Sequence, residues 1–212
     1  MVVASVSASE KRRLALRDHK RKAILAAARR VCDAAGPEAL TMRAVAAQAG
    51  YAPGAVYSYF SGIGELAIAL TAEELGHLAR RMRDAAEEEK TPAAALAAAS
   101  RELLAATAGN APHLRLAGRL ISPDGLSADL DRAITGRVIA VLETLGGPLR
   151  AATGLEGEAA HREILSLAAF LIGLRVLESA GRLSPLGFNA QSLLETRLAS
   201  ATRHCFFPGH HD

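Results

Sequence analysis

The sequence predicts an all-α protein of roughly nine helices, and three observations support this. Alanine and leucine carry the apolar fraction, which is half of the 212 residues, whereas aromatic residues make up 4% and tryptophan is absent. This composition favours helices over strands. Apolar residues recur every three to four positions, and no long stretch alternates with a period of two. Glycine and proline punctuate the periodic stretches. A β-sandwich, a collagen-like chain and a disordered chain are therefore all disfavoured.

The first three helices are expected to be short. Apolar residues at helical spacing over 24–35 predict the first, which ends at Gly36-Pro37. Thr41 is a suitable N-cap for a second helix that closes at Gly50, since glycine adopts the left-handed conformation without strain. Pro53 suits the first turn of a third helix, where a missing N–H costs no hydrogen bond.

The later helices are expected to be longer. Thr91-Pro92 has the pattern of a cap followed by a proline in the first turn, and Gly146, Gly147 and Pro148 are interpreted as a break. The expected ranges are 65–89, 92–108, 112–121, 127–145, 158–180 and 189–206.

Positive charge gathers at the start of the chain. The formal net charge is +3, but residues 1–60 hold ten Lys/Arg against four acids, which gives +6 there and −3 over the rest. A basic N-terminal region on a mildly acidic body indicates a polyanionic partner at one end. The alternative is a solvated basic tail that binds nothing.

The number of cysteines and the hydropathy pattern indicate the cellular compartment. Cys32 and Cys205 are too few for a disulfide framework, which favours a reducing environment. The N-terminus has no apolar region typical of a signal peptide, and the longest apolar runs stop near ten residues, too short to span a bilayer. We expect a cytoplasmic protein that does not associate with membranes.

A motif extends over about fifty residues of the N-terminal part. It consists of Ile24-Leu25, Ala27-Ala28, Gly36, Thr41, Ala49-Gly50, Gly54, Val56-Tyr57, Tyr59-Phe60 and Leu66. In this order the residues resemble the helix-turn-helix domain of the TetR family of transcriptional regulators. Helix geometry is consistent with this resemblance, because Val56 and Phe60 lie one turn apart and can both face a three-helix core.

The resemblance implies a domain organisation and a function. We expect a basic disordered arm over 1–17, a helix-turn-helix domain over 18–78 with its motif at 41–60, and a ligand-binding and dimerisation domain over 79–212. A TetR-like protein of this kind would bind a palindromic double-stranded DNA operator. It would most simply be a repressor released by a hydrophobic small-molecule inducer, and it would need no cofactor.

The resemblance also implies which residues contact DNA. Thr41, Ala55 and Tyr59 would lie near phosphates, while Pro53, Gly54 and Tyr57 would approach base edges. The complete predicted DNA-binding set is Thr41, Met42, Arg43, Tyr51, Ala52, Pro53, Gly54, Ala55, Tyr57, Ser58 and Tyr59. The alternative for Tyr57 and Tyr59 is that they are core aromatics with solvated hydroxyls.

Two residues depart from the family pattern. Ala52 stands where the family usually has a Ser or Thr cap, and Ile63 stands where it commonly has a phosphate-contacting Lys. The basic segment from Lys11 to Lys22 is the obvious substitute for that contact. No Arg, Asn, Gln or Lys lies between Ala52 and Phe60, so we expect base discrimination through thymine methyl groups and DNA shape.

The body is expected to form a homodimer and a pocket. By resemblance, the dimer forms through helices 158–180 and 189–206, with Leu171 and Leu174 as candidate seam residues; the alternative is a core helix in a monomer. Small alanines on facing helices favour an apolar pocket, although they could equally allow close packing with no void. Its candidate ligand-binding residues are His113, Arg115, Arg119, Thr144, Phe170 and Arg175.

Other function classes are disfavoured. The chain has no nucleophile-elbow, phosphate-loop or dinucleotide-binding motif, so we expect no enzymatic activity. His204, Cys205, His210 and His211 cluster near the end, but their spacing matches no established metal site, and we expect none. The main rival to a regulator is a helical scaffold or interaction protein that does not recognise a DNA sequence.

Overall fold

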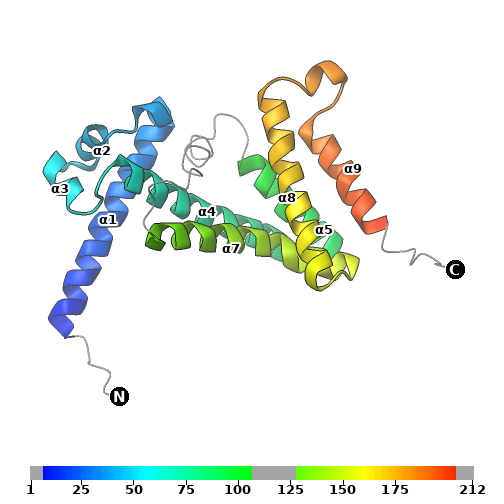
Figure 1. The fold of residues 1–212 in the computed structure, drawn as a ribbon, viewed down its shortest axis with the longest axis horizontal. Helices are drawn as coiled ribbons and strands as arrows, with labels where there is room; N and C mark the ends of the chain where they lie inside the picture. The colour runs from blue at the N-terminus through cyan, green and yellow to red at the C-terminus, as the bar shows by residue number, and fades with distance from the viewer. Residues whose placement is uncertain (1–6, 107–127, 204–212) are drawn as a thin grey trace. The chain divides into compact units, whose positions relative to one another are not determined.

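A computed structural model describes residues 7–106 and 128–203 (Figure 1). These residues form eight α-helices and no strand, which confirms the predicted all-α class. None of these helices is long and apolar enough to cross a membrane. The elements are α1 (Ala8–Ala35), η1 (Pro37–Ala39), α2 (Met42–Ala49), α3 (Pro53–Tyr57), α4 (Ile63–Glu87), α5 (Pro92–Ala106), α7 (Ala128–Thr153), α8 (Gly157–Ser179), η2 (Ser184–Leu186) and α9 (Ala190–Arg203).

The described residues divide into two compact units. The first holds residues 7–71 and 128–130, and the second holds residues 72–106 and 131–203, so that α4 continues from one into the other. The helix expected over 112–121 lies outside the described residues, as do the candidate ligand-binding residues His113, Arg115 and Arg119.

Helix α1 is longer than the sequence predicts. Residues 8–17, expected to belong to a disordered arm, are helical in the structure. The helix begins where the Ser7 hydroxyl accepts a hydrogen bond from the backbone N–H of Glu10, at 3.2 Å. Good helix formers such as leucine, arginine, alanine and lysine then fill the turns that follow. All side chains from Ala8 to His19 are exposed, so no tertiary packing holds this segment.

The first unit forms around a small core under α2 and α3. Thr41 caps α2 by accepting from Ala44 N–H at 3.1 Å, and Gly50 ends it at φ 72°, as predicted. Pro53 occupies the first turn of α3, whereas Ala52 makes no side-chain cap. The core residues come from α1, α2, α3, α4 and the turn between α3 and α4, and include Ile24, Leu25, Val45, Val56, Phe60, Leu66 and Leu70.

The second unit has a core of its own, made almost entirely of leucine and alanine. Thr91 caps α5 by accepting from Ala94 N–H at 3.2 Å, which confirms the predicted helix start. Helices α4, α5, α7, α8 and α9 all contribute to this core. Its most completely buried large side chains are Met82, Leu96, Leu145, Leu149, Leu167, Leu171 and Leu194.

The predicted break at Gly146–Pro148 is wrong, because α7 continues through it to Thr153. Leu145 and Leu149 flank these residues and are both fully buried, so core packing outweighs the low helix propensity of glycine and proline. Gly146 has a packing role: a Cβ there would lie 3.1 Å from Ile164 Cδ1 on α8. The helix instead ends at Gly154, whose φ is 71°.

Helix α8 has two apolar faces. Leu167, Leu171 and Leu174 are at most 5% exposed and pack into the core of the second unit. The expectation that Leu171 or Leu174 forms an intermolecular seam is therefore wrong. A second stripe of large apolar side chains is exposed to solvent. It consists of Leu165 (57% exposed), Ile172 (51%) and Val176 (60%). These residues are spaced by seven and four positions, so they share one face of the helix.

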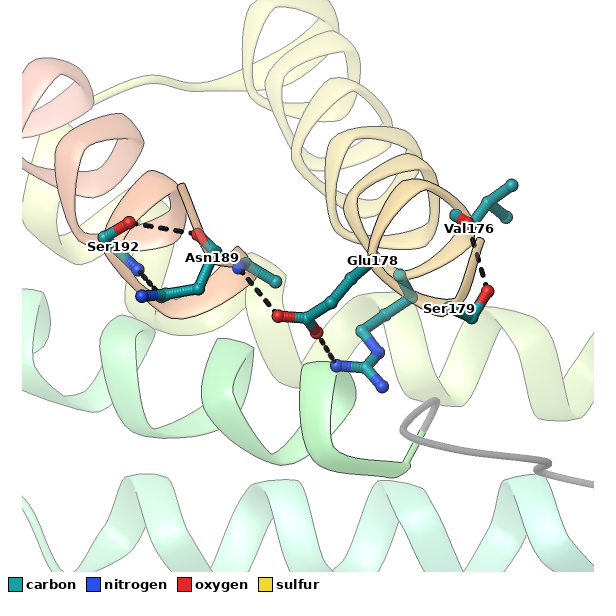
Figure 2. A network of polar contacts seen from close by, with 7 residues as sticks. Val176, Glu178, Ser179, Asn189 and Ser192 are labelled. Carbon is teal, nitrogen blue, oxygen red and sulfur yellow. Dashed lines mark hydrogen bonds and ion pairs between the residues drawn. The ribbon is translucent and has the colours of Figure 1, made fainter. Parts of the chain in front are cut away.

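A polar network joins α8 to α9 (Figure 2). The Glu178 carboxylate forms an ion pair with Arg175 on the same helix and accepts a hydrogen bond from Ala190 N–H, the first residue of α9, at 3.0 Å. Asn189 caps α9 by accepting from Ser192 N–H at 2.8 Å. The network satisfies N–H groups that the start of a helix leaves unpaired, and it fixes the connection between the two helices.

Candidate nucleic-acid interface

Helices α2 and α3 are joined by a tight turn of the helix-turn-helix type. Gly50 donates its N–H to Ala47 O at 3.2 Å, and Tyr51 N–H bonds back to Ala46 O at 2.9 Å. These bonds satisfy carbonyls at the end of α2 and direct the chain into α3 within three residues. The geometry presents α3 at the surface of the first unit.

Helix α3 separates its side chains into a buried and an exposed set. Val56 is fully buried, and so is Phe60 in the turn that follows, which anchors the helix on the core. Pro53, Gly54, Ala55, Tyr57 and Ser58 are exposed, as the sequence predicts for groups that face a groove. The Ser58 hydroxyl donates to Ala55 O at 2.7 Å, so only its oxygen remains free to accept.

The three tyrosines and Met42 near this face differ in exposure. Tyr57 is 54% exposed, with its ring and hydroxyl available to a partner. Tyr51 and Tyr59 are half-buried and pack against the core. The alternative of a core aromatic therefore describes part of the role of Tyr59. Met42 is 7% exposed and its side chain belongs to the core. It could contact DNA only through its backbone at the start of α2.

The N-terminus of α2 and the end of α3 enclose an open depression of about 400 Å³. Thr41 and Arg43 are exposed there, and the Thr41 hydroxyl proton is free because its oxygen serves as the helix cap. Ile63, 39% exposed, is in the lining. This aliphatic side chain stands where the family commonly has a phosphate-contacting Lys. The lining residues are Leu40, Thr41, Met42, Arg43, Tyr57 and Ile63.

The candidate ligand residues of the second unit are dispersed. Thr144 is buried and donates to Val141 O at 2.6 Å, and it lines a depression of about 400 Å³. Phe170 packs against the core, and Arg175 is paired with Glu178. The depression is more polar than the predicted apolar cavity, and neither Phe170 nor Arg175 lines it. The lining residues are Arg83, Ala86, Glu87, Ala95, Ala140, Glu143, Thr144 and Pro148.

Metal ligands are not assembled in the described part of the chain. No group of three or more His, Cys, Asp or Glu residues there could hold an ion. Burial, and secondarily the neighbouring Asp33 carboxylate, raises the pKa of the Cys32 thiol, which keeps it neutral and a poor ligand. The C-terminal cluster of His204, Cys205, His210 and His211 lies outside the described residues.

A short exposed helix, a tight turn and a capped supporting helix on a compact core define a helix-turn-helix DNA-binding domain. Residues 24–70 match the family model described as bacterial regulatory proteins, tetR family. This match confirms the resemblance seen in the motif residues. Residues 24–70 are therefore a DNA-binding domain of the TetR type.

Solved structures share the fold over most of the chain. A protein of unknown function from Rhodococcus sp. RHA1 has a TM-score of 0.70 at 20% identity, covering 87% of this chain and 94% of its own. FadR from Bacillus subtilis, in complex with stearoyl-CoA, has a TM-score of 0.60 at 20% identity, with coverages of 85% and 97%.

A TetR regulator from Streptomyces coelicolor has a TM-score of 0.64 at 17% identity, with coverages of 87% and 96%. At these identities the likeness concerns the fold. No curated protein matches the chain at a significant level.

Proposed function

We propose that the protein is a homodimeric repressor that binds a palindromic operator through α3. The exposed surface of α3 on a rigid core is the observation that carries this proposal. A five-residue helix reads few base pairs, so two copies related by a two-fold axis would supply the necessary contact area. Their recognition helices would then reach major-groove faces about 34–36 Å apart, or a multiple of that spacing.

Base recognition would depend on apolar contacts and one hydroxyl. Pro53, Ala55 and Ile63 offer aliphatic groups to thymine methyls, and Tyr57 offers a ring together with a hydroxyl that donates and accepts. Thr41 and Arg43 would contact phosphates from the start of α2, where the helix dipole also favours an anion. The operator half-site is therefore expected to be rich in A·T pairs.

The exposed stripe of α8 supports a homodimer. Leu165, Ile172 and Val176 place three large apolar side chains on one solvent-facing stripe, which a second copy of the same helix would cover. Helix α9 is fixed to α8 by Glu178, so the two helices can act together as an interface. The two-fold symmetry of this arrangement matches the symmetry of a palindromic operator.

Release by a small molecule is the regulatory part of the proposal. The fold is shared with FadR, which was solved with stearoyl-CoA, and this supports a hydrophobic inducer bound in the second unit near Thr144, Phe170 or Arg175. Helix α4 belongs to both units, so it can carry a change of position from one to the other. An inducer would act only through its differential affinity for the DNA-bound and free states.

The DNA part is tested by selecting bound duplexes from a random pool and titrating the recovered operator with variants. Tyr57→Ala is expected to weaken operator binding by about 1–3 kcal/mol. Tyr57→Phe separates the hydroxyl from the ring and serves as the matched variant. If selection recovers no common sequence, the helical scaffold alternative replaces this proposal.

The inducer part is tested on α5, where Ala95 lines the depression and Ala93 is exposed. Ala95→Phe is expected to abolish release of the operator by stearoyl-CoA, used as the probe, while DNA binding itself persists. Ala93→Phe should leave release intact. If stearoyl-CoA releases the operator from both variants, the inducer site lies away from this depression.

A further inference from the structure

The first four turns or so of α1 project beyond the core of the first unit. Figure 1 shows this N-terminal end of α1 extending past α2 and α3. Buried residues of α1 begin only at Ile24, and residues 8–22 span about 22 Å at 1.5 Å per residue. A helical segment this long, with no core contact for most of its length, offers its side chains to a partner.

One face of the projecting segment carries a series of arginines. Arg13, Arg17 and Arg21 are spaced four residues apart, so they share a face and rise by about 6 Å from one to the next. Ile24 and Leu25 lie three and four residues beyond Arg21 and are buried in the core. The face of α1 that packs on the domain core thus continues outward as a face of guanidinium groups.

The inner end of this arginine series is fixed beside the recognition element. The Arg21 guanidinium carbon lies 4.7 Å from the centroid of the Phe60 ring, in a cation–π contact. Phe60 is buried in the turn that follows α3, two residues after the exposed Ser58. The arginine face therefore starts at the C-terminal side of the helix that presents Tyr57.

The outer arginines are accessible to a ligand. Arg13 lies 3.9 Å from the Glu10 carboxylate, but the two side chains are 79% and 52% exposed. An ion pair this open contributes little and exchanges readily for another anion. Arginine also forms bidentate hydrogen bonds with phosphate, which lysine does not.

We propose that Arg13 and Arg17, aligned by Arg21 on Phe60, form an arginine ladder that binds the DNA phosphates flanking the groove entered by α3. The proposal rests on the DNA-binding function above and adds a second contact element to it. Because the segment is helical, its contacts are directional rather than those of a flexible tail.

The test compares two double variants with equal loss of charge. Arg13→Gln with Arg17→Gln removes the ladder, whereas Lys11→Gln with Arg12→Gln removes two cations from the opposite face. Affinity is measured against salt concentration, by fluorescence anisotropy, for the selected operator and for a duplex of unrelated sequence. Glutamine preserves helix propensity, and circular dichroism verifies helix content.

The ladder variant is expected to bind both duplexes on the order of tenfold to a hundredfold more weakly at 0.1 M salt, with a log–log salt slope shallower by about 1.8, or 0.9 per phosphate. The opposite-face variant should change the slope by less than half as much. Equal losses in the two variants would mean a diffuse charge effect and overturn the ladder. Unchanged slopes in both would show that the segment does not contact DNA.

The two proposals fail in different ways. If the wild type shows no sequence preference, the operator function fails, but the slope on unrelated DNA still tests the ladder. If Tyr57→Ala lowers operator affinity while the ladder variant binds like the wild type, the ladder alone is wrong.

Discussion

The two units bury similar cores but expose opposite chemistry. The first exposes guanidinium groups, a tyrosine ring and the start of α2, whereas the second exposes a stripe of leucine, isoleucine and valine on α8. Cations on a helical surface suit a polyanion, and aliphatic side chains on a helix suit another apolar face. Both units bury apolar side chains, so their cores do not distinguish their functions. The side chains that each unit leaves exposed do.

The largest expected effect on stability comes from comparing a substitution on the buried face of α8 with one on its exposed face. Leu171→Glu places a carboxylate in the core of the second unit and should cost more than about 4 kcal/mol, enough to unfold that unit. Ile172→Glu, one residue further, lies on the exposed stripe and should leave the fold intact while dissociating the dimer. Urea denaturation followed by circular dichroism measures the first effect, and sedimentation equilibrium measures the second.

The wild-type protein provides the control for this pair. A monomer at micromolar concentration would contradict the role assigned to Leu165, Ile172 and Val176, whatever the variants do. A dimer that survives Ile172→Glu would move the interface elsewhere on the second unit.

The next largest effect comes from replacing each of two aromatic residues in the helix-turn-helix motif. Phe60→Ala opens the core of the first unit and removes the ring beneath Arg21, with an expected loss of about 3–5 kcal/mol. Tyr57→Ala, at a position 54% exposed, should change stability by less than about 0.5 kcal/mol and affect DNA binding instead. Native-state hydrogen exchange would locate the loss, which should appear in α1–α3 and leave α8 protected.

The local structure of the first unit could be predicted because its determinants are close in sequence. Thr41 and Gly50 start and end α2 through bonds within five residues, and Pro53 starts α3 in the same way. Exposure of the α3 face followed from the one-turn spacing of Val56 and Phe60. The family motif then assigned a function to a geometry that local chemistry already supported.

The second unit was less predictable because long-range packing decides it. Gly146 and Pro148 indicate a break by local propensity, yet burial of Leu145 and Leu149 keeps α7 continuous. Helix α8 is apolar on several faces, so its sequence does not show which leucines face inward. Only the contacts with α5, α7 and α9 separate Leu171 from Ile172.

The helical start of α1 was also missed. Charge density suggested disorder, but the Ser7 cap and strong helix formers are a local signal that could have indicated the helix.

A smaller effect compares the caps of the two units. Thr41 and Thr91 accept from backbone N–H groups at 3.1 Å and 3.2 Å, and replacing either with alanine should cost about 1 kcal/mol. The consequences should differ, because only Thr41 lies in the DNA-facing depression. Thr41→Ser retains the cap and separates its contribution from that of the methyl group. Equal operator affinity in Thr41→Ala and Thr91→Ala, measured below their melting temperatures, would remove Thr41 from the interface.

The smallest effect tests whether α7 is continuous in solution. Gly147 lies inside the helix with open space where a Cβ would be placed, so Gly147→Ala should stabilise the second unit by about 0.5–1 kcal/mol. Gly146→Ala offers the same gain in propensity, but its Cβ would lie 3.1 Å from Ile164 Cδ1 and from Arg150 Nη1. Those neighbours must shift, so its net gain should be smaller than that of Gly147→Ala. Thermal denaturation of the two variants measures the difference. If the chain instead breaks at these glycines, as local propensity suggests, neither alanine would stabilise the protein, and Gly147→Ala would be as unfavourable as its neighbour.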